Sequence, residues 1–105
     1  SIVGKEFRAP YSASKFGMDG LTASLAAEVA ESGVLVNSVA PGFIDTELTR
    51  KVLEEQGMKE MAEKVPIRRM GQPEEVARLV LWLASDENTF VSAQNIAIDG
   101  GFTRV

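Results

Sequence analysis

The 105-residue sequence contains no cysteine and no histidine, and these two absences exclude several kinds of site. Without them the chain cannot form a Ser-His-Asp triad, a Cys-His catalytic pair or a zinc site with the usual nitrogen and sulfur ligands. The absence of cysteine also excludes a disulfide scaffold, which argues against a small extracellular domain. We therefore expect a cytoplasmic protein with no metal site.

Basic residues are also few, since 11 Lys and Arg stand against 15 Asp and Glu for a formal net charge of −4. An acidic chain lacks the electrostatic footprint of a nucleic-acid binder. The basic residues are scattered apart from Arg68-Arg69, so they form no polybasic membrane patch. No apolar run approaches the roughly 20 residues of a membrane helix, and the first ten residues lack the apolar core of a signal peptide. We expect neither nucleic acid nor a membrane as a partner.

The hydrophobic pattern predicts alternating helices and strands in a chain of ordinary globular composition, 45% hydrophobic and 25% charged. Spacings of three and four residues predict helices, β-branched apolar runs predict buried strands, and Pro and Gly mark the boundaries. In order, we predict a strand end at 1–3, a helix over 11–31, a strand over 34–40, helices over 47–56 and 58–64 separated by Gly57, a helix over 73–84 and a strand over 95–98.

This order indicates an α/β fold with a parallel sheet, because helical crossovers join its strands. Three strands are few for such a sheet, so we expect residues 1–105 to be a single partial domain, with about half of the whole domain absent.

Tyr11 and Lys15 are the strongest candidates for chemistry. They lie four residues apart at the start of a predicted helix, and therefore share one face. An ammonium near a phenol favours the phenolate, and such a phenol can exchange a proton with a carbonyl or an alcohol. Taken alone, the pair is weak evidence, because an aromatic residue near a helix start and a solvated lysine are the commoner explanation of this spacing.

Four motifs in order give this pair a context, and they cover essentially the whole chain. Tyr11 to Gly17 resembles the active-site helix of the short-chain dehydrogenase/reductase family, and Val36 to Thr46 resembles its strand and cofactor loop. Gly71 to Ala77 is similar to its next helix entry, and Ile98 to Gly101 to its closing strand and turn. The resemblance implies the C-terminal half of a Rossmann-type doubly wound parallel sheet. Within the family, the loop motifs most resemble those of 3-oxoacyl-carrier-protein reductases.

The resemblance also implies roles for particular residues. Tyr11 would be the general acid and base, and Lys15 would bind the nicotinamide ribose and favour the Tyr11 phenolate. Pro41 and Gly42 would form a wall beside the nicotinamide of NAD or NADP, and the Ile44 backbone and Thr46 would meet its carboxamide and phosphates. Ligands of open α/β sheets bind at the carboxyl ends of the strands, which is where Pro41-Gly42 is predicted to lie. The expected partners are a small carbonyl or alcohol substrate and further copies of the chain, as a homodimer or homotetramer.

Ser1 is the third catalytic candidate, because the family places a serine at a strand end before the tyrosine. Only nine residues separate Ser1 from Tyr11, which is shorter than the usual family spacer. The glycine-rich dinucleotide fingerprint, the selector between NAD and NADP and the proton-relay asparagine are absent from these 105 residues. Ser92-Ala93 stands where the family commonly has Thr-Gly before the last strand.

Two functions remain open on the sequence. The first is an oxidoreductase that needs further sequence for activity, so that these 105 residues alone would be inactive. The second is a non-catalytic fragment of the same fold that pairs with another chain. A hydrolase using paired carboxylates is disfavoured, because no two acidic residues fall in a predicted cleft.

Overall fold

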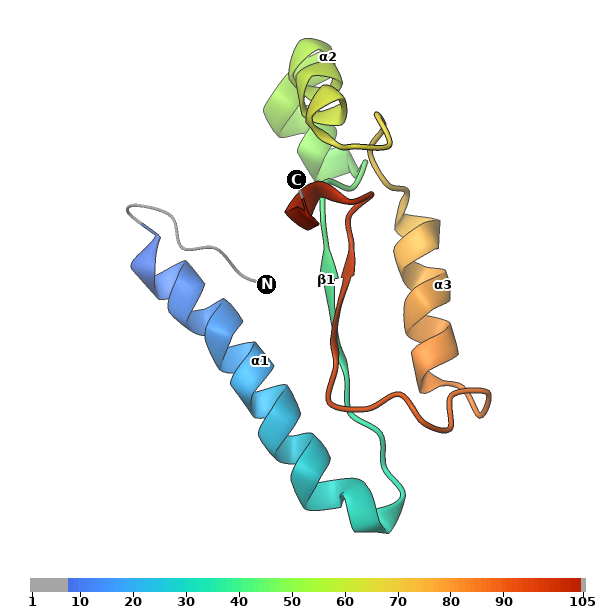
Figure 1. Cartoon of the computed structure of the whole chain (residues 1–105). Coiled ribbons are helices and arrows are strands. Elements are labelled where there is room, and N and C mark those ends of the chain that lie inside the picture. Colours follow the sequence, from blue (N-terminus) through green and yellow to red (C-terminus); the bar gives the residue numbers. More distant parts are fainter. Residues whose placement is uncertain (1–7, 105) are drawn as a thin grey trace. The chain divides into compact units, whose positions relative to one another are not determined.

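The computed structural model describes residues 8–104, so Ser1 and the strand end predicted at 1–3 lie outside the described residues. The elements follow in the order α1, η1, β1, α2, α3, β2 and η2, the last being a 3₁₀ turn over Phe102–Arg104 (Figure 1). They form two compact units. The first contains the chain up to Ser38 together with Asn88–Ile96, and the second contains Val39–Glu87 and the chain from Ala97.

Helix α1 spans Ala9–Val29 and continues as the 3₁₀ turn η1, Ala30–Ser32, which confirms the predicted helix to within two residues at either end. Pro10 lies in the first turn, where its missing N–H is no loss. Gly33 ends the helix in the left-handed conformation, with φ of 78°, and donates its N–H to the Ala30 carbonyl oxygen. Thr22 and Ala26 are buried one turn apart.

Strand β1 spans Ser38–Pro41 and therefore begins four residues later than predicted. Val36 donates its N–H to Ser92 Oγ at 3.0 Å, and the Asn37 side chain bonds the backbone of Val91 and Gln94. The segment before β1 is thus held against residues 91–94 largely through side chains. The predicted buried strand over 34–40 is therefore wrong for its first four residues, and no residue of this stretch is fully buried, with Val34 50% exposed. Side-chain hydrogen bonds replace part of the regular ladder there.

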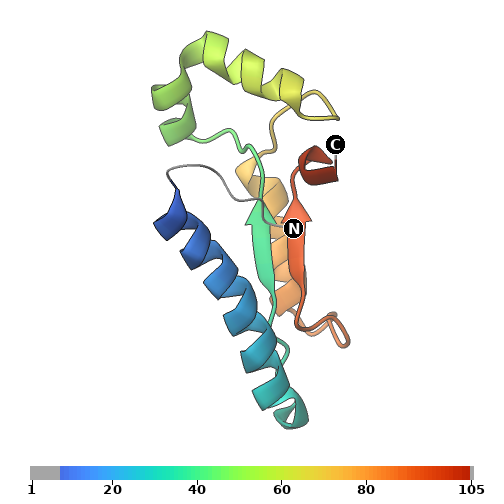
Figure 2. The ribbon, with the colours of Figure 1, turned by 60° about the vertical axis from the view of Figure 1, so that its left-hand side comes forward.

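Strand β2 spans Asn95–Ile98, as predicted, and pairs with β1 in a two-stranded sheet. Ser38 donates to the Gln94 oxygen at 2.9 Å, and Gly42 donates to the Ile98 oxygen at 3.0 Å. Because the partner number rises with the donor number, the strands are parallel, and both arrows point the same way in Figure 2. The predicted α/β fold with a parallel sheet is confirmed.

Helix α2 spans Glu47–Lys64, and the predicted break at Gly57 is wrong. The helix is instead interrupted at Glu54, whose φ of 56° and ψ of −178° are not helical. A glycine inside a helix costs only about 1 kcal/mol, so it permits a break without imposing one. The position of the interruption is not encoded in a helix-breaking residue type.

Helix α3 spans Pro73–Ala84 and begins with a capping box. Gln72 donates its N–H to Glu75 Oε1 at 3.0 Å, and the acids of the first turn complement the helix dipole. Of the apolar residues spaced by three and four in this helix, Val76, Leu79 and Leu83 are half-buried, whereas Val80 is 45% exposed.

The buried apolar residues are few within the described part of the chain: Ala26, Val65 and Met70. Val65 and Met70 bracket the turn between α2 and α3, which anchors that turn in the second unit. Many large apolar side chains on α1 and α3 stay exposed. No helix in the described range 8–104 is long and apolar enough to cross a bilayer.

Candidate active site

The first group of candidate residues lies on the opening turns of α1, in the first unit. Lys15 Nζ lies 5.4 Å from the centre of the Tyr11 ring, so the predicted shared face exists. Both side chains are exposed, and 56% of Tyr11 is accessible. The Tyr11 hydroxyl makes no hydrogen bond to any residue of the described range, whereas its backbone oxygen accepts from Ser14 Oγ at 2.7 Å. The phenol is therefore available to a ligand.

A second cation lies beside the same ring, which the sequence analysis did not single out. Arg8 Cζ is 5.9 Å from the centre of the Tyr11 ring. Arg8 precedes α1 directly and makes no side-chain capping bond to the helix. The spacing of three residues before Tyr11 is the signal that could have revealed it.

The second group of candidates lies at the end of β1 and in the loop after it, in the second unit, and Gly42 is its most constrained member. A Cβ atom at Gly42 would lie 2.6 Å from Asp99 Cβ and 2.9 Å from Asp99 Cα. Pro41, directly before it, is exposed. The close approach that glycine permits here is thus made by Asp99, which follows β2.

Ile44 is held by its neighbours in a way that leaves its own backbone groups unused. It forms an isolated parallel bridge with Gly71, in which Gly71 donates to the Phe43 oxygen and Asp45 donates to the Gly71 oxygen, both at 2.9 Å. Within the described residues, the N–H and C=O of Ile44 itself have no hydrogen-bond partner. A donor and an acceptor are therefore fixed side by side on a half-buried, braced segment.

Thr46 caps α2 rather than projecting free of the backbone. Its Oγ1 accepts a hydrogen bond from the Thr49 N–H at 3.1 Å and lies 2.9 Å from Thr49 Oγ1. The neighbouring Asp45 pairs with Arg50 at 2.6 Å, and this hydrogen bond lowers the pKa of the Asp45 carboxyl. Both contacts fix where the loop enters the helix.

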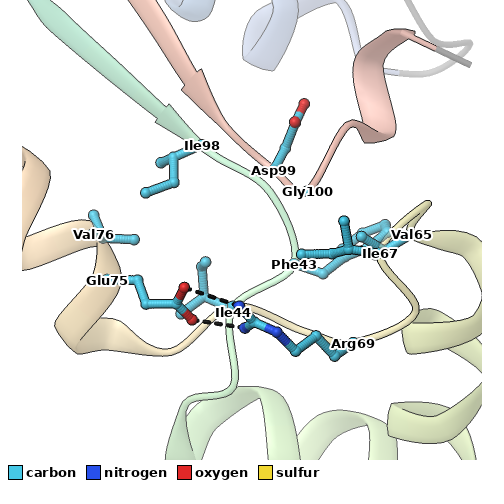
Figure 3. Close-up of a pocket in the computed structure, with 11 residues that line it drawn as sticks. Phe43, Ile44, Val65, Ile67, Arg69, Glu75, Val76, Ile98, Asp99 and Gly100 are labelled. Carbon is cyan, nitrogen blue, oxygen red and sulfur yellow. Dashed lines mark hydrogen bonds and ion pairs between the residues drawn. The ribbon is translucent and has the colours of Figure 1, made fainter.

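A small apolar cavity of about 50 Å³ lies behind this loop (Figure 3). This volume is far below the several hundred Å³ of a typical ligand pocket. Its lining comprises Phe43, Ile44, Val65, Ile67, Arg69, Gly71, Glu75, Val76, Ile98, Asp99 and Gly100.

Glu75 and Asp99 line this cavity, and their carboxylates accept hydrogen bonds from the segments around it. Arg69 pairs with Glu75 at 2.7 Å, and this bond, with the Gln72 N–H, lowers the pKa of Glu75 to about 2. Partial burial alone would raise the pKa of Asp99, but hydrogen bonds from Thr103 and Gly101 outweigh it and lower that pKa. The sequence predicts Glu75 at a helix start and Asp99 in a turn, but it carries no signal of the hydrogen bonds that the two carboxylates accept.

The structure thus places Pro41 at the end of β1 and Gly42, Ile44 and Thr46 in the loop that follows, all in the second unit. It places Tyr11 with Lys15 on one helix of the first unit. The role predicted for Ser1 lies outside the described residues. Within the range 8–104, no three Asp or Glu residues cluster as a metal site would require.

The chain is similar in sequence to proteins that are named as reductases. The family model described as enoyl-(acyl carrier protein) reductase matches residues 1–103. A 3-oxoacyl-(acyl-carrier-protein) reductase FabG of Thermotoga maritima is 46% identical over 100 residues, covering 95% of this chain and 40% of that protein. An acetoacetyl-CoA reductase of Shinella zoogloeoides is 41% identical over 98 residues, covering 93% of this chain and 41% of that protein.

Solved structures with the same fold carry related names. A short chain dehydrogenase family protein from Francisella tularensis superposes with a TM-score of 0.90 at 32% identity, covering 99% of this chain and 47% of that one. ElxO with NADP bound superposes with a TM-score of 0.88 at 30% identity, covering 98% and 42%. The chain therefore spans less than half the length of each of these relatives.

Proposed function

The chain belongs to the short-chain dehydrogenase/reductase family, and from this premise we propose that the intact protein containing it transfers a hydride between NAD(P)H and a carbonyl or secondary alcohol. Residues 1–105 are the C-terminal portion of its Rossmann-type domain in this proposal. We also propose that the intact protein contains a dinucleotide-binding half, is cytoplasmic and assembles as a homodimer or homotetramer.

The observation that carries the proposal is the accessible Tyr11 phenol beside the Lys15 ammonium. In the reducing direction the Tyr11 hydroxyl donates its proton to the substrate carbonyl oxygen, and in the oxidising direction the phenolate accepts it from the alcohol. Lys15 stabilises the phenolate through its charge. Ser1 would hold the substrate oxygen in place for this proton transfer.

The loop after β1 offers groups that suit a nicotinamide cofactor. The unused N–H and C=O of Ile44 match the acceptor and donor of a carboxamide, which is the fit we rely on. Pro41 and Gly42 would flank the ring, Lys15 and Tyr11 would meet the ribose, and Thr46 would approach the phosphates. When bound, the cofactor supplies the hydride donor or acceptor. Whether it is NAD or NADP is decided outside these residues.

Substitution of Tyr11 by Phe in the intact protein tests the proposal. Turnover of a ketone with NADH or NADPH should fall by about 10²- to 10⁴-fold, the usual contribution of a general acid or base. The unfolding midpoint should not move, because the Tyr11 hydroxyl has no hydrogen-bond partner in the described range. Ser14→Ala, which removes a hydroxyl one turn away, should keep its activity.

Unchanged turnover in Tyr11→Phe would reject the catalytic role. Absence of turnover in the unmodified intact protein, with either cofactor, would favour the alternative of a non-catalytic member that pairs with another chain. A separate titration of the 105-residue chain tests whether it is inactive alone: micromolar binding of NADH or NADPH would contradict that expectation.

A further inference from the structure

Two cations lie near the Tyr11 ring, and the proposed function uses only one of them. Lys15 Nζ lies 5.4 Å and Arg8 Cζ 5.9 Å from the ring centre. Residues three before and four after a helical position fall on the same face, so both charges accompany the phenol. The reaction requires one cation to stabilise the phenolate, which leaves Arg8 without an assigned task.

Arg8 has no carboxylate partner within residues 8–104. The ion pairs found there join Arg50 to Asp45 and Arg69 to Glu75. The first turn of α1 contains no acidic residue, and Arg8 makes no side-chain hydrogen bond in the described range. A guanidinium beside an aromatic ring keeps its N–H donors, which lie in its own plane and match a carboxylate.

The position of Arg8 limits where a bound anion could sit on the substrate. The phenol oxygen is attached to the ring over which Arg8 lies, so an anion paired with Arg8 must be only a few bonds from the carbonyl that meets Tyr11. The carboxylate of a 2-oxo or 3-oxo acid satisfies this condition. The phosphates of a coenzyme A or carrier-protein substrate do not, because many bonds separate them from the reacting carbonyl.

We propose that Arg8 is a specificity-determining residue, which binds the carboxylate of a small oxo acid whose ketone is reduced at Tyr11. This inference rests on the proposed function and names the substrate class for it. Arg8 and the carboxylate form a charge-assisted, bidentate pair that brings the neighbouring ketone to the phenol. The uncharged ester of the same acid reaches Tyr11 without that contact.

The test compares acetoacetate with ethyl acetoacetate in the intact protein, with NADH and with NADPH. The unmodified protein should prefer acetoacetate. Arg8→Gln should lower kcat/KM for acetoacetate by about 10- to 100-fold, as expected for loss of a hydrogen bond to a charged group. Turnover of the ester should stay within about threefold, which also shows that the variant is folded. Arg8→Lys should retain part of the preference, since it keeps the charge but not the paired donors.

The matched control is Arg78→Gln, which removes the same charge from an exposed position on α3. It should leave both substrates unaffected. Preference of the unmodified protein for the ester, or an equal effect of Arg8→Gln on both substrates, would overturn the inference while the reductase function stands. If the unmodified protein reduces neither substrate but does reduce another ketone, the inference alone is overturned. If it reduces no ketone with either cofactor, the proposed function fails as well.

Discussion

Replacement of Gly42 by Ala should destabilise the protein, although the backbone there is not in the left-handed region. The added Cβ would lie 2.6 Å from Asp99 Cβ and must retreat to at least the 3.4 Å of an ordinary contact. That retreat separates the two strand ends, which are joined by the 3.0 Å hydrogen bond from Gly42 to Ile98. Overpacking costs about 1–3 kcal/mol, and a lost hydrogen bond adds about 1 kcal/mol. We expect the free energy of unfolding to fall by about 2–4 kcal/mol.

Urea denaturation of the intact protein, followed by circular dichroism, measures this loss. Gly20→Ala is the matched control, because a Cβ there meets no atom within 4 Å and alanine favours the helix. That control should gain up to about 1 kcal/mol. A double variant that also carries Asp99→Gly should lose less than the sum of the two single losses, because the strongest contact has gone. A loss below about 0.5 kcal/mol in Gly42→Ala, typical of a surface substitution, would refute the steric reasoning.

Three further substitutions test other features. Ala93 has a φ of 60°, so Ala93→Gly should raise the free energy of unfolding by about 1 kcal/mol in urea denaturation. Glu54→Gly should raise it by about 1–2 kcal/mol, because φ of 56° with ψ of −178° is nearly confined to glycine; no gain in thermal or urea unfolding would contradict that strain. Because the pKa of Glu75 lies at about 2 in the folded state against 4.5 ordinarily, its pairing stabilises the fold above pH 4.5 and is lost as the pH falls towards 2. Glu75→Gln should therefore flatten the acid limb of a stability profile, and an unchanged limb would show that the pair with Arg69 contributes nothing.

The candidate site was predictable to the extent that its residues depend on local spacing. The four-residue spacing of Tyr11 and Lys15 predicts that they share one face of a helix. Their motif, together with the motif from Val36 to Thr46, indicates the family. The contacts behind the loop were not predictable, because each joins segments distant in the chain: Gly42 to Asp99, Ile44 to Gly71, and Arg69 to the start of α3. The family resemblance already pointed to the Ile44 backbone, but only the bridge to Gly71 shows that its N–H and C=O are left unpaired within the described residues.

By itself the sequence determined the helices, the strand β2 and the parallel α/β class, because periodicity, proline entry and glycine caps act within a few residues. Only the tertiary structure decided where β1 begins, since Asn37 and Ser92 substitute side-chain bonds for the backbone ladder. It likewise decided that α2 is interrupted at Glu54 and not at Gly57. Nothing in the structure explains that interruption. The contacts that delay β1 join segments more than fifty residues apart, which no local preference can signal.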